Sequence, residues 1–244
     1  MRRLLFTLSY DGTNYHGWQV QPNGITVQQC VQEAFQSVTG AQCSITGCSR
    51  TDAGVHANMF CFHTDTDCNI PADKFVLAIN SALPDDIVVT DCKEVAGDFH
   101  ARYDCKGKTY IYKIYDGYLR NPFLNGYAYH HKGMLDAELM NKAAKQFIGR
   151  YDFAGFCSSG SSVQDTVRTV SDCYVKRCGR NIEFGITADG FLYNMVRIIV
   201  GTLIDVSDGR IDADSIRDII ISKQRDLAGQ TAPAHGLYLN KVNY

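Results

Sequence analysis

The spacing of apolar residues divides the chain into short strands and helices that alternate from end to end. Within residues 26–39, Val27, Val31, Ala34 and Phe35 recur on one face of a helix, and Gly40 is suited to end it. The same reading predicts further helices over residues 71–83, 136–149, 191–206 and 212–224. Strands are predicted over residues 4–10, 58–64, 87–95, 108–115, 169–178, 182–188 and 236–244.

Strand–helix–strand units occur both before and after about residue 100. Residues 169–188 read as a β-hairpin because two strand-like runs are separated only by Gly179-Arg180-Asn181. This pattern predicts an α+β protein made of two similar halves, residues 1–101 and 102–244, with antiparallel pairing at the hairpin.

Composition places the chain among ordinary globular proteins. Of its 244 residues, 45% are hydrophobic and 20% are charged. No apolar run approaches the roughly 18 residues that a membrane span needs, and the N-terminus lacks a signal-peptide core. We therefore expect a cytoplasmic protein with no membrane partner. Its ten cysteines form no CxxC pair, so they are expected to serve as small apolar core residues.

The charge is unevenly distributed along the chain. The net charge is −2, but residues 100–181 hold thirteen Lys and Arg against seven Asp and Glu. Such a basic zone suits a polyanion if its side chains share one face, and is otherwise a set of scattered, solvated charges. Charge alone leaves both interpretations open.

Several catalytic motifs fail on inspection. Gly107-Lys108-Thr109 resembles the end of a phosphate-binding loop, but Arg102 stands where its leading glycine should be. A partial calcium loop starting at Asp65 lacks its glycine and its final glutamate. No HExxH or GxSxG motif is present. The sequence thus lends no support to a nucleotide-driven enzyme, a zinc hydrolase or a serine hydrolase.

One acidic loop remains as candidate chemistry. In CSRTDAGVHA, residues 48–57, Asp52 is the one acid, with Arg50 before it and His56 after it. Loops between regular elements often carry catalytic groups, but Asp and Gly are also common in simple turns. Spacing alone does not distinguish a catalytic Asp52 from an Asp52 that merely forms a turn.

The predicted helix over residues 191–206 carries a narrow polar stripe through Asn194, Arg197 and Gly201 on an otherwise apolar surface. A buried Arg197 would need an anionic partner. That partner could be a structural acid or Asp52, whose pKa an arginine within about 4–6 Å would lower by roughly 1–3 units. In the second case Asp52 would be an ionised nucleophile.

Residues 100–120 alternate five tyrosines with five Lys and Arg. Aromatic faces can stack on unpaired bases while cations follow phosphates, although tyrosine is also common in ordinary strands. Both interpretations can hold at once, because Tyr110 and Tyr112 share one face of the strand and Ile111 and Lys113 the other.

Taken together, these segments resemble the tRNA pseudouridine synthase A family. Its signatures recur in order across nearly the whole chain. They are YDGTNYHGWQ at 10–19, GCSRTDAGVHA at 47–57, FHAR at 99–102, KTYIYKIY at 108–115, FLYNMVRIIVG at 191–201 and TAPAHGLYL at 231–239. Of these, the RTDAGVHA block is the most specific.

The resemblance implies a fold, an activity and a set of site residues. The fold is a mixed, mainly antiparallel sheet from two pseudo-symmetric halves flanked by helices. The activity is the isomerisation of uridine to pseudouridine in the anticodon stem-loop of tRNA, at the family's positions 38–40, by a homodimer. Asp52 matches the catalytic aspartate, Arg50 and Arg197 match active-site arginines, and Tyr110 matches the tyrosine that packs on the target base. His56, Arg102 and Lys108 are assigned to substrate binding.

A single carboxylate suffices for this reaction in principle, because uracil is a tolerable leaving anion. No cofactor and no metal are expected. In CSSGSSVQD, residues 157–165, many relatives carry a longer basic stretch, so an RNA contact from this segment is doubtful here. The alternatives are a pseudouridine synthase acting on another RNA and a non-catalytic tRNA-binding protein.

Overall fold

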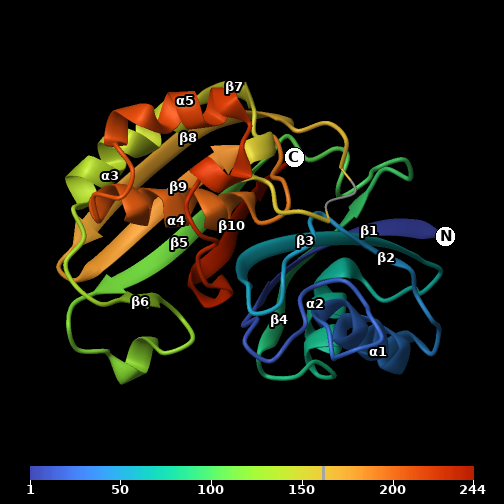
Figure 1. Cartoon of the computed structure of the whole chain (residues 1–244). Coiled ribbons are helices and arrows are strands. Elements are labelled where there is room, and N and C mark those ends of the chain that lie inside the picture. The colour runs from blue at the N-terminus through green and yellow to red at the C-terminus, as the bar shows by residue number, and fades with distance from the viewer. Residues whose placement is uncertain (161–162) are drawn as a thin grey trace. The chain divides into compact units, whose positions relative to one another are not determined.

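The structure, a computed structural model, describes residues 1–160 and 163–244, and these group into two compact units. Unit 1 comprises Met1–Lys106 with Tyr238–Tyr244, and unit 2 comprises Gly107–Leu237. Each unit combines helices with a mixed, mainly antiparallel sheet, which confirms the predicted α+β class (Figure 1). The division at residue 101 stays a prediction. Among the described residues, no helix has both the length and the apolar character that crossing a membrane demands.

Unit 1 is a sheet in the order β4-β1-β3-β10, with β1 antiparallel to β3 and β4, and β10 parallel to β3. The short β2 pairs with β3. Figure 1 shows α1 and α2 together on one face of this sheet. The elements are β1 Arg2–Tyr10, α1 Val27–Thr39, β2 Ile45–Gly47, β3 His56–Thr66, α2 Ala72–Asn80, β4 Ile87–Val95 and β10 Leu237–Asn243.

Aromatic rings fill the core of unit 1. Phe6 of β1 stacks on Phe62 of β3 at 5.0 Å, and Phe35 of α1 stacks on Phe75 of α2 at 5.2 Å. All four side chains are almost completely buried. Each would contribute about 1.5–3 kcal/mol by leaving water, and this burial fixes both helices against the sheet that carries the loop of Asp52.

Unit 2 is an antiparallel sheet in the order β5-β9-β8-β7, to which β6 adds in parallel beside β5. The predicted hairpin is confirmed as β8 and β9, joined through Gly179 in the left-handed conformation. Its strands are β5 Gly107–Asp116, β6 Tyr129–His131, β7 Gly149–Asp152, β8 Val167–Cys178 and β9 Asn181–Ala188. Its helices are α3 Ala137–Ala144, α4 Met195–Ser207 and α5 Ile216–Ser222.

Helix α1 matches its prediction closely, whereas four others are shorter than predicted. Thr26 caps α1 and Gly40 ends it in the left-handed conformation. Helix α2 ends at Asn80. Part of the range predicted for α3, and part of that predicted for α5, forms a short 3₁₀ turn instead of α-helix. The predicted start of α4 at residue 191 is wrong, because Asn194 adopts a left-handed backbone and the helix begins at Met195.

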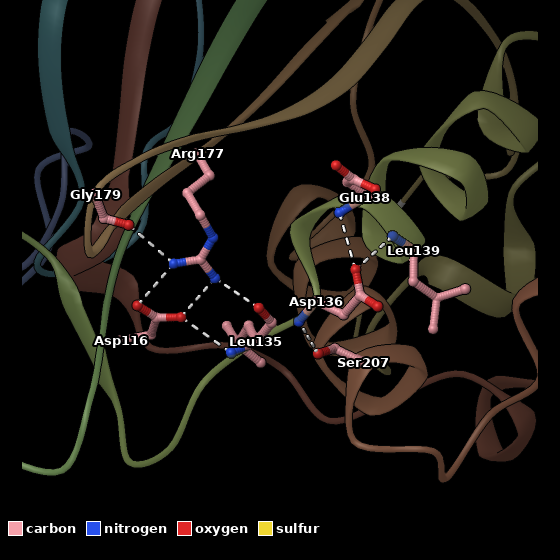
Figure 2. Close-up of polar contacts among 8 residues, drawn as sticks. All are labelled: Asp116, Leu135, Asp136, Glu138, Leu139, Arg177, Gly179 and Ser207. Atoms are coloured by element: carbon pink, nitrogen blue, oxygen red, sulfur yellow. Dashed lines mark hydrogen bonds and ion pairs between the residues drawn. The ribbon is translucent and has the colours of Figure 1, made fainter.

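An ion pair between a fully buried carboxylate and a partly buried guanidinium joins β5 to β8 in unit 2. Figure 2 shows the guanidinium of Arg177 facing the carboxylate of Asp116 in a two-pronged contact, with Nη1–Oδ1 and Nη2–Oδ2 distances of 3.1 and 2.7 Å. Asp116 also accepts a 3.0 Å hydrogen bond from the amide of Leu135 and has no exposed side-chain surface. Burial acts to raise the pKa of Asp116, but the bonds from Arg177 and the Leu135 amide outweigh it and hold that pKa below its usual value.

Candidate active site

The loop that carries Asp52 lies between β2 and β3 and is held by backbone hydrogen bonds from the segment that follows β1. The amide of Trp18 donates to the carbonyl of Thr51 at 3.1 Å, and the amide of Gly54 donates to the carbonyl of Tyr15 at 3.3 Å. The hydroxyls of Tyr10 and Thr51 are hydrogen-bonded at 2.7 Å. These bonds fix the backbone on both sides of Asp52, whose side chain is half-buried.

Two glycines let these segments approach so closely. A Cβ atom on Gly12 would lie 2.0 Å from the carbonyl oxygen of Val55, and one on Gly17 would lie 2.4 Å from that of Thr51. Gly17 also has a φ of +81°. Only glycine combines this backbone with this proximity. The spacing of apolar residues over residues 11–24 does not predict this supporting role, for which the glycines at 12 and 17 are the signal in the sequence.

The three other predicted residues of unit 1 differ in exposure. Arg50 is exposed on the Asp52 loop. His56, at the start of β3, is 2% exposed, accepts a 3.1 Å hydrogen bond from the amide of Gly12, and stacks on Tyr238 at 4.6 Å. These contacts support a positioning role for His56, and its contact with substrate stays a prediction. Arg102 is exposed in a turn, and its backbone amide donates a 3.2 Å hydrogen bond to Nδ1 of His100.

In unit 2, Tyr110 lies on β5 and is 6% exposed, with its ring edge-to-face against Phe191 at 4.9 Å. Tyr112 shares this face, as predicted, but it is completely buried and its hydroxyl donates to the carbonyl of Pro233 at 2.7 Å. Burial raises the pKa of Tyr112. Tyr112 is therefore a core residue rather than a platform for bases. Lys108, at the start of the same strand, is 9% exposed.

Arg197 lies in the first turn of α4 and is held from two sides. Its Nε donates to the carbonyl of Ala232 at 2.7 Å, and its Nη1 donates to the side-chain oxygen of Asn194 at 2.8 Å. The backbone carbonyl of Arg197 in turn accepts from the amide of Ala232 at 3.0 Å. The predicted polar stripe thus brings Asn194 to Arg197, although Asn194 lies outside the helix. Such fixed bonds orient a guanidinium before any anion arrives.

The segment over residues 157–165 contributes to this arrangement. Ser158 accepts a 2.9 Å hydrogen bond from the side-chain amide of Asn194, and its own amide donates to the carbonyl of Tyr193 at 3.1 Å. Residues 161–162, in the middle of the predicted departure from the family pattern, lie outside the described residues. The loss of an RNA contact from this segment stays a prediction.

The candidate residues thus fall into two groups, one in each unit. Unit 1 carries Asp52, Arg50, His56 and Arg102, and unit 2 carries Tyr110, Lys108 and Arg197. The pairing of Asp52 with Arg197 and Tyr110 remains a prediction. Over residues 1–160 and 163–244, no group of three or more His, Cys, Asp or Glu side chains is arranged to hold a metal ion.

A family model and two relatives in sequence name the same family. A family model described as tRNA pseudouridine synthase matches residues 7–104 and 143–244. Proteins called tRNA pseudouridine synthase A from Acetivibrio thermocellus and Clostridium acetobutylicum are 49% and 45% identical to this chain over 244 residues, 100% of both chains in each case. A solved chain titled "Crystal Structure of a Cbf5-Nop10-Gar1 Complex" is 11% identical, with a TM-score of 0.35. That match covers 85% of this chain and 54% of the solved one, and the score is too low to support an argument.

Proposed function

This chain belongs to the tRNA pseudouridine synthase family, and from that premise we propose that it isomerises uridine to pseudouridine in the anticodon stem-loop of tRNA, with Asp52 as the nucleophile. The observation that carries the proposal is the loop of Asp52. Asp52 is half-buried and stands two positions after the exposed Arg50, on a backbone that hydrogen bonds and close glycine contacts hold in place. Catalytic groups need such fixed placement, because small displacements reduce rates strongly.

The reaction exchanges one bond of the ribose for another. The bond from C1′ to N1 of uracil breaks, the uracil turns, and C5 bonds to C1′. The C5 hydrogen leaves as a proton and N1 gains one, so atoms balance without an added reagent. Asp52 supplies the nucleophilic oxygen, because uracil can leave as an anion that cationic groups stabilise.

The residues of unit 2 have complementary roles in the proposal. Tyr110 packs on the target uracil, and Arg197 places a fixed positive charge beside the Asp52 carboxylate. Support comes from the two hydrogen bonds that orient Arg197 and from the rigid setting of Tyr110 against Phe191. Arg102 and Lys108 bind the RNA backbone, and His56 holds the Asp52 loop against Gly12. A uracil held in place rejoins the sugar as an effectively intramolecular reaction, worth up to roughly 7–11 kcal/mol.

The test is tritium release from tRNA that carries 5-tritiated uridine. Asp52→Asn preserves the size of the side chain but removes the nucleophile, so release should fall about a thousandfold or more while tRNA affinity stays within about twofold. Asp73→Asn is the matched control, because Asp73 is an exposed acid at the start of α2. Undiminished release by Asp52→Asn would remove Asp52 from the mechanism. Binding without release by the wild-type protein would support a non-catalytic tRNA-binding protein instead.

The RNA and the assembly are also part of the proposal. We infer a homodimer, as the family resemblance implies, and we propose that it acts in the cytoplasm. Mapping pseudouridines in RNA from cells with and without this protein tests the anticodon stem-loop against other RNAs. Loss of the modification from another RNA alone would retain the chemistry and change the substrate.

A further inference from the structure

One segment of unit 2 carries basic and aromatic residues but no acid. Residues 117–134, here called the 117–134 loop, contain no Asp or Glu, although Asp116 directly precedes them and Asp136 follows two positions after residue 134. Arg120 and Lys132 are both exposed. The 117–134 loop falls between the two stretches that match the family model, residues 7–104 and 143–244, so that match assigns it no role.

The base of the 117–134 loop is firmly anchored. Figure 2 shows Asp116, which precedes the loop, and Leu135, which follows it, joined through Arg177. The amide of Gly117 donates to the carbonyl of His131 at 3.1 Å, and β6 pairs with β5. These bonds bring the two ends together at the edge of the sheet, so the loop is displayed from a fixed position.

Large apolar side chains of the 117–134 loop are exposed. Tyr118, Leu119 and Phe123 are 75%, 77% and 88% exposed. The short 3₁₀ turn Pro122–Leu124 sets the backbone here, and the side chain of Asn121 accepts from the amide of Phe123 at 3.0 Å. In Figure 1 the green loop beside the β6 label, which contains this turn, extends away from the strands of unit 2. Three such side chains held in water within six positions are typical of a binding surface.

We propose that the 117–134 loop binds unpaired nucleotides of the RNA substrate, with Tyr118 and Phe123 stacking on bases and Arg120 and Lys132 contacting phosphates. The proposal rests on the proposed function for the identity of the ligand. Aromatic faces beside cations are the chemistry that binds single-stranded RNA without reading its sequence. The guanidinium of Arg180, which lies against Gly117, adds a further cation at the base of the loop.

Charge favours RNA over a second copy of the chain as the occupant. A symmetric dimer contact would bring the same patch of both copies together. In such a contact of loop with loop, Arg120 and Lys132 would meet residues 117–134 of the other copy, which include no Asp or Glu to offset them. A polyanion satisfies these cations instead.

The experiment measures the affinity of an unmodified tRNA transcript by fluorescence anisotropy for four variants. Tyr118→Ala and Phe123→Ala should each weaken binding at least about fivefold, since stacking of one base is worth roughly 1–3 kcal/mol. Tyr118→Phe retains the ring and should retain affinity. Leu119→Ala removes an equally exposed apolar group without a ring and should change affinity less than twofold. Sedimentation velocity and thermal unfolding of each variant accompany these measurements.

Two further readouts sharpen the result. Arg120→Gln with Lys132→Gln should lower the slope of log affinity against log salt by roughly 0.7 per cation removed. Phe123→Ala should leave that slope unchanged and raise KM in the tritium assay, with kcat unchanged at saturating tRNA.

Equal losses of affinity in Leu119→Ala and Phe123→Ala, together with dissociation of an oligomer, would overturn the proposal in favour of a protein contact. Unchanged tRNA affinity in Tyr118→Ala and Phe123→Ala, while the wild-type protein releases tritium, would overturn the proposed role of the 117–134 loop. The proposed function would then still stand. Failure of the wild-type protein to release tritium would instead count against the proposed function.

Discussion

Replacing Gly201 with alanine should disturb the segment that holds Arg197. Gly201 lies in α4, where a Cβ atom would stand 1.7 Å from the carbonyl oxygen of Gln230. Ordinary contacts of a Cβ begin at 3.4 Å, so the backbone at Gln230 must retreat by about 1.5 Å or more. Two residues later, Ala232 accepts the hydrogen bond from Nε of Arg197. The substitution thus acts on Arg197 without touching its side chain.

The magnitude follows from opposing contributions. Overpacking a close contact costs about 1–3 kcal/mol, and losing a charged hydrogen bond costs about 1.5–3 kcal/mol. The higher helix propensity of alanine offsets up to about 1 kcal/mol of this loss of stability. We therefore expect Gly201→Ala to lower the free energy of unfolding by about 1.5–6 kcal/mol. If Arg197 shifts by about 1 Å, kcat/KM should fall roughly a hundredfold.

Urea unfolding and tritium release, measured where the variant is fully folded, separate the two effects. Gly97→Ala is the control, because a Cβ there would meet nothing within 4 Å. If Gly201→Ala acts through Arg197, adding it to Arg197→Lys should cost much less activity than it costs alone. A Gly201→Ala protein as stable and as active as the wild type would refute the reasoning.

Two further predictions concern charge. Asp116→Asn should lower the free energy of unfolding by about 3 kcal/mol at pH 7, because it breaks a buried pair. Since the pKa of Asp116 is lowered in the folded protein, the pair contributes fully above about pH 5 and loses its contribution as the pH falls through that pKa. Urea unfolding from pH 7 to pH 3 should show the two proteins converging in acid, and a constant difference would contradict the pairing. Separately, tRNA affinity should fall steeply and linearly on a log–log plot against salt, and a flat response would argue against the basic zone as the docking surface.

Local signals predicted the regular elements well where the chain marks their ends chemically. Thr26 and Gly40 bound α1 in the sequence and in the structure. The predicted start of α4 was wrong because the apolar periodicity of the sequence continues through residues 191–194. Periodicity carries no information about backbone torsion. Asn194 tolerates the left-handed region there, and its side chain gains a partner in Arg197 by leaving the helix.

Candidate site residues could be named only where a family signature contains them, and their roles stay predictions. Asp52 and Arg197 follow from family signatures, whereas spacing alone could not distinguish Asp52 from a turn residue. Backbone groups take part in holding these regions: the carbonyl of Tyr15 binds the Asp52 loop at Gly54, and the carbonyl of Ala232 binds Arg197. A backbone carbonyl has no side-chain signature, so its role emerges only when distant segments are brought together in space.

The same physical device positions a candidate catalytic side chain in each unit. In unit 1, Gly12 and Gly17 let one backbone lie against the loop of Asp52, and in unit 2, Gly201 lets α4 lie against the segment that binds Arg197. Missing side chains allow backbone groups to approach closely, and backbone groups move less freely than long side chains. Precision at Asp52 and Arg197 should therefore depend more on these glycines than on the neighbouring side chains. Substitutions that add a single carbon at these glycines should impair activity more than truncations of larger neighbours that leave the backbone in place.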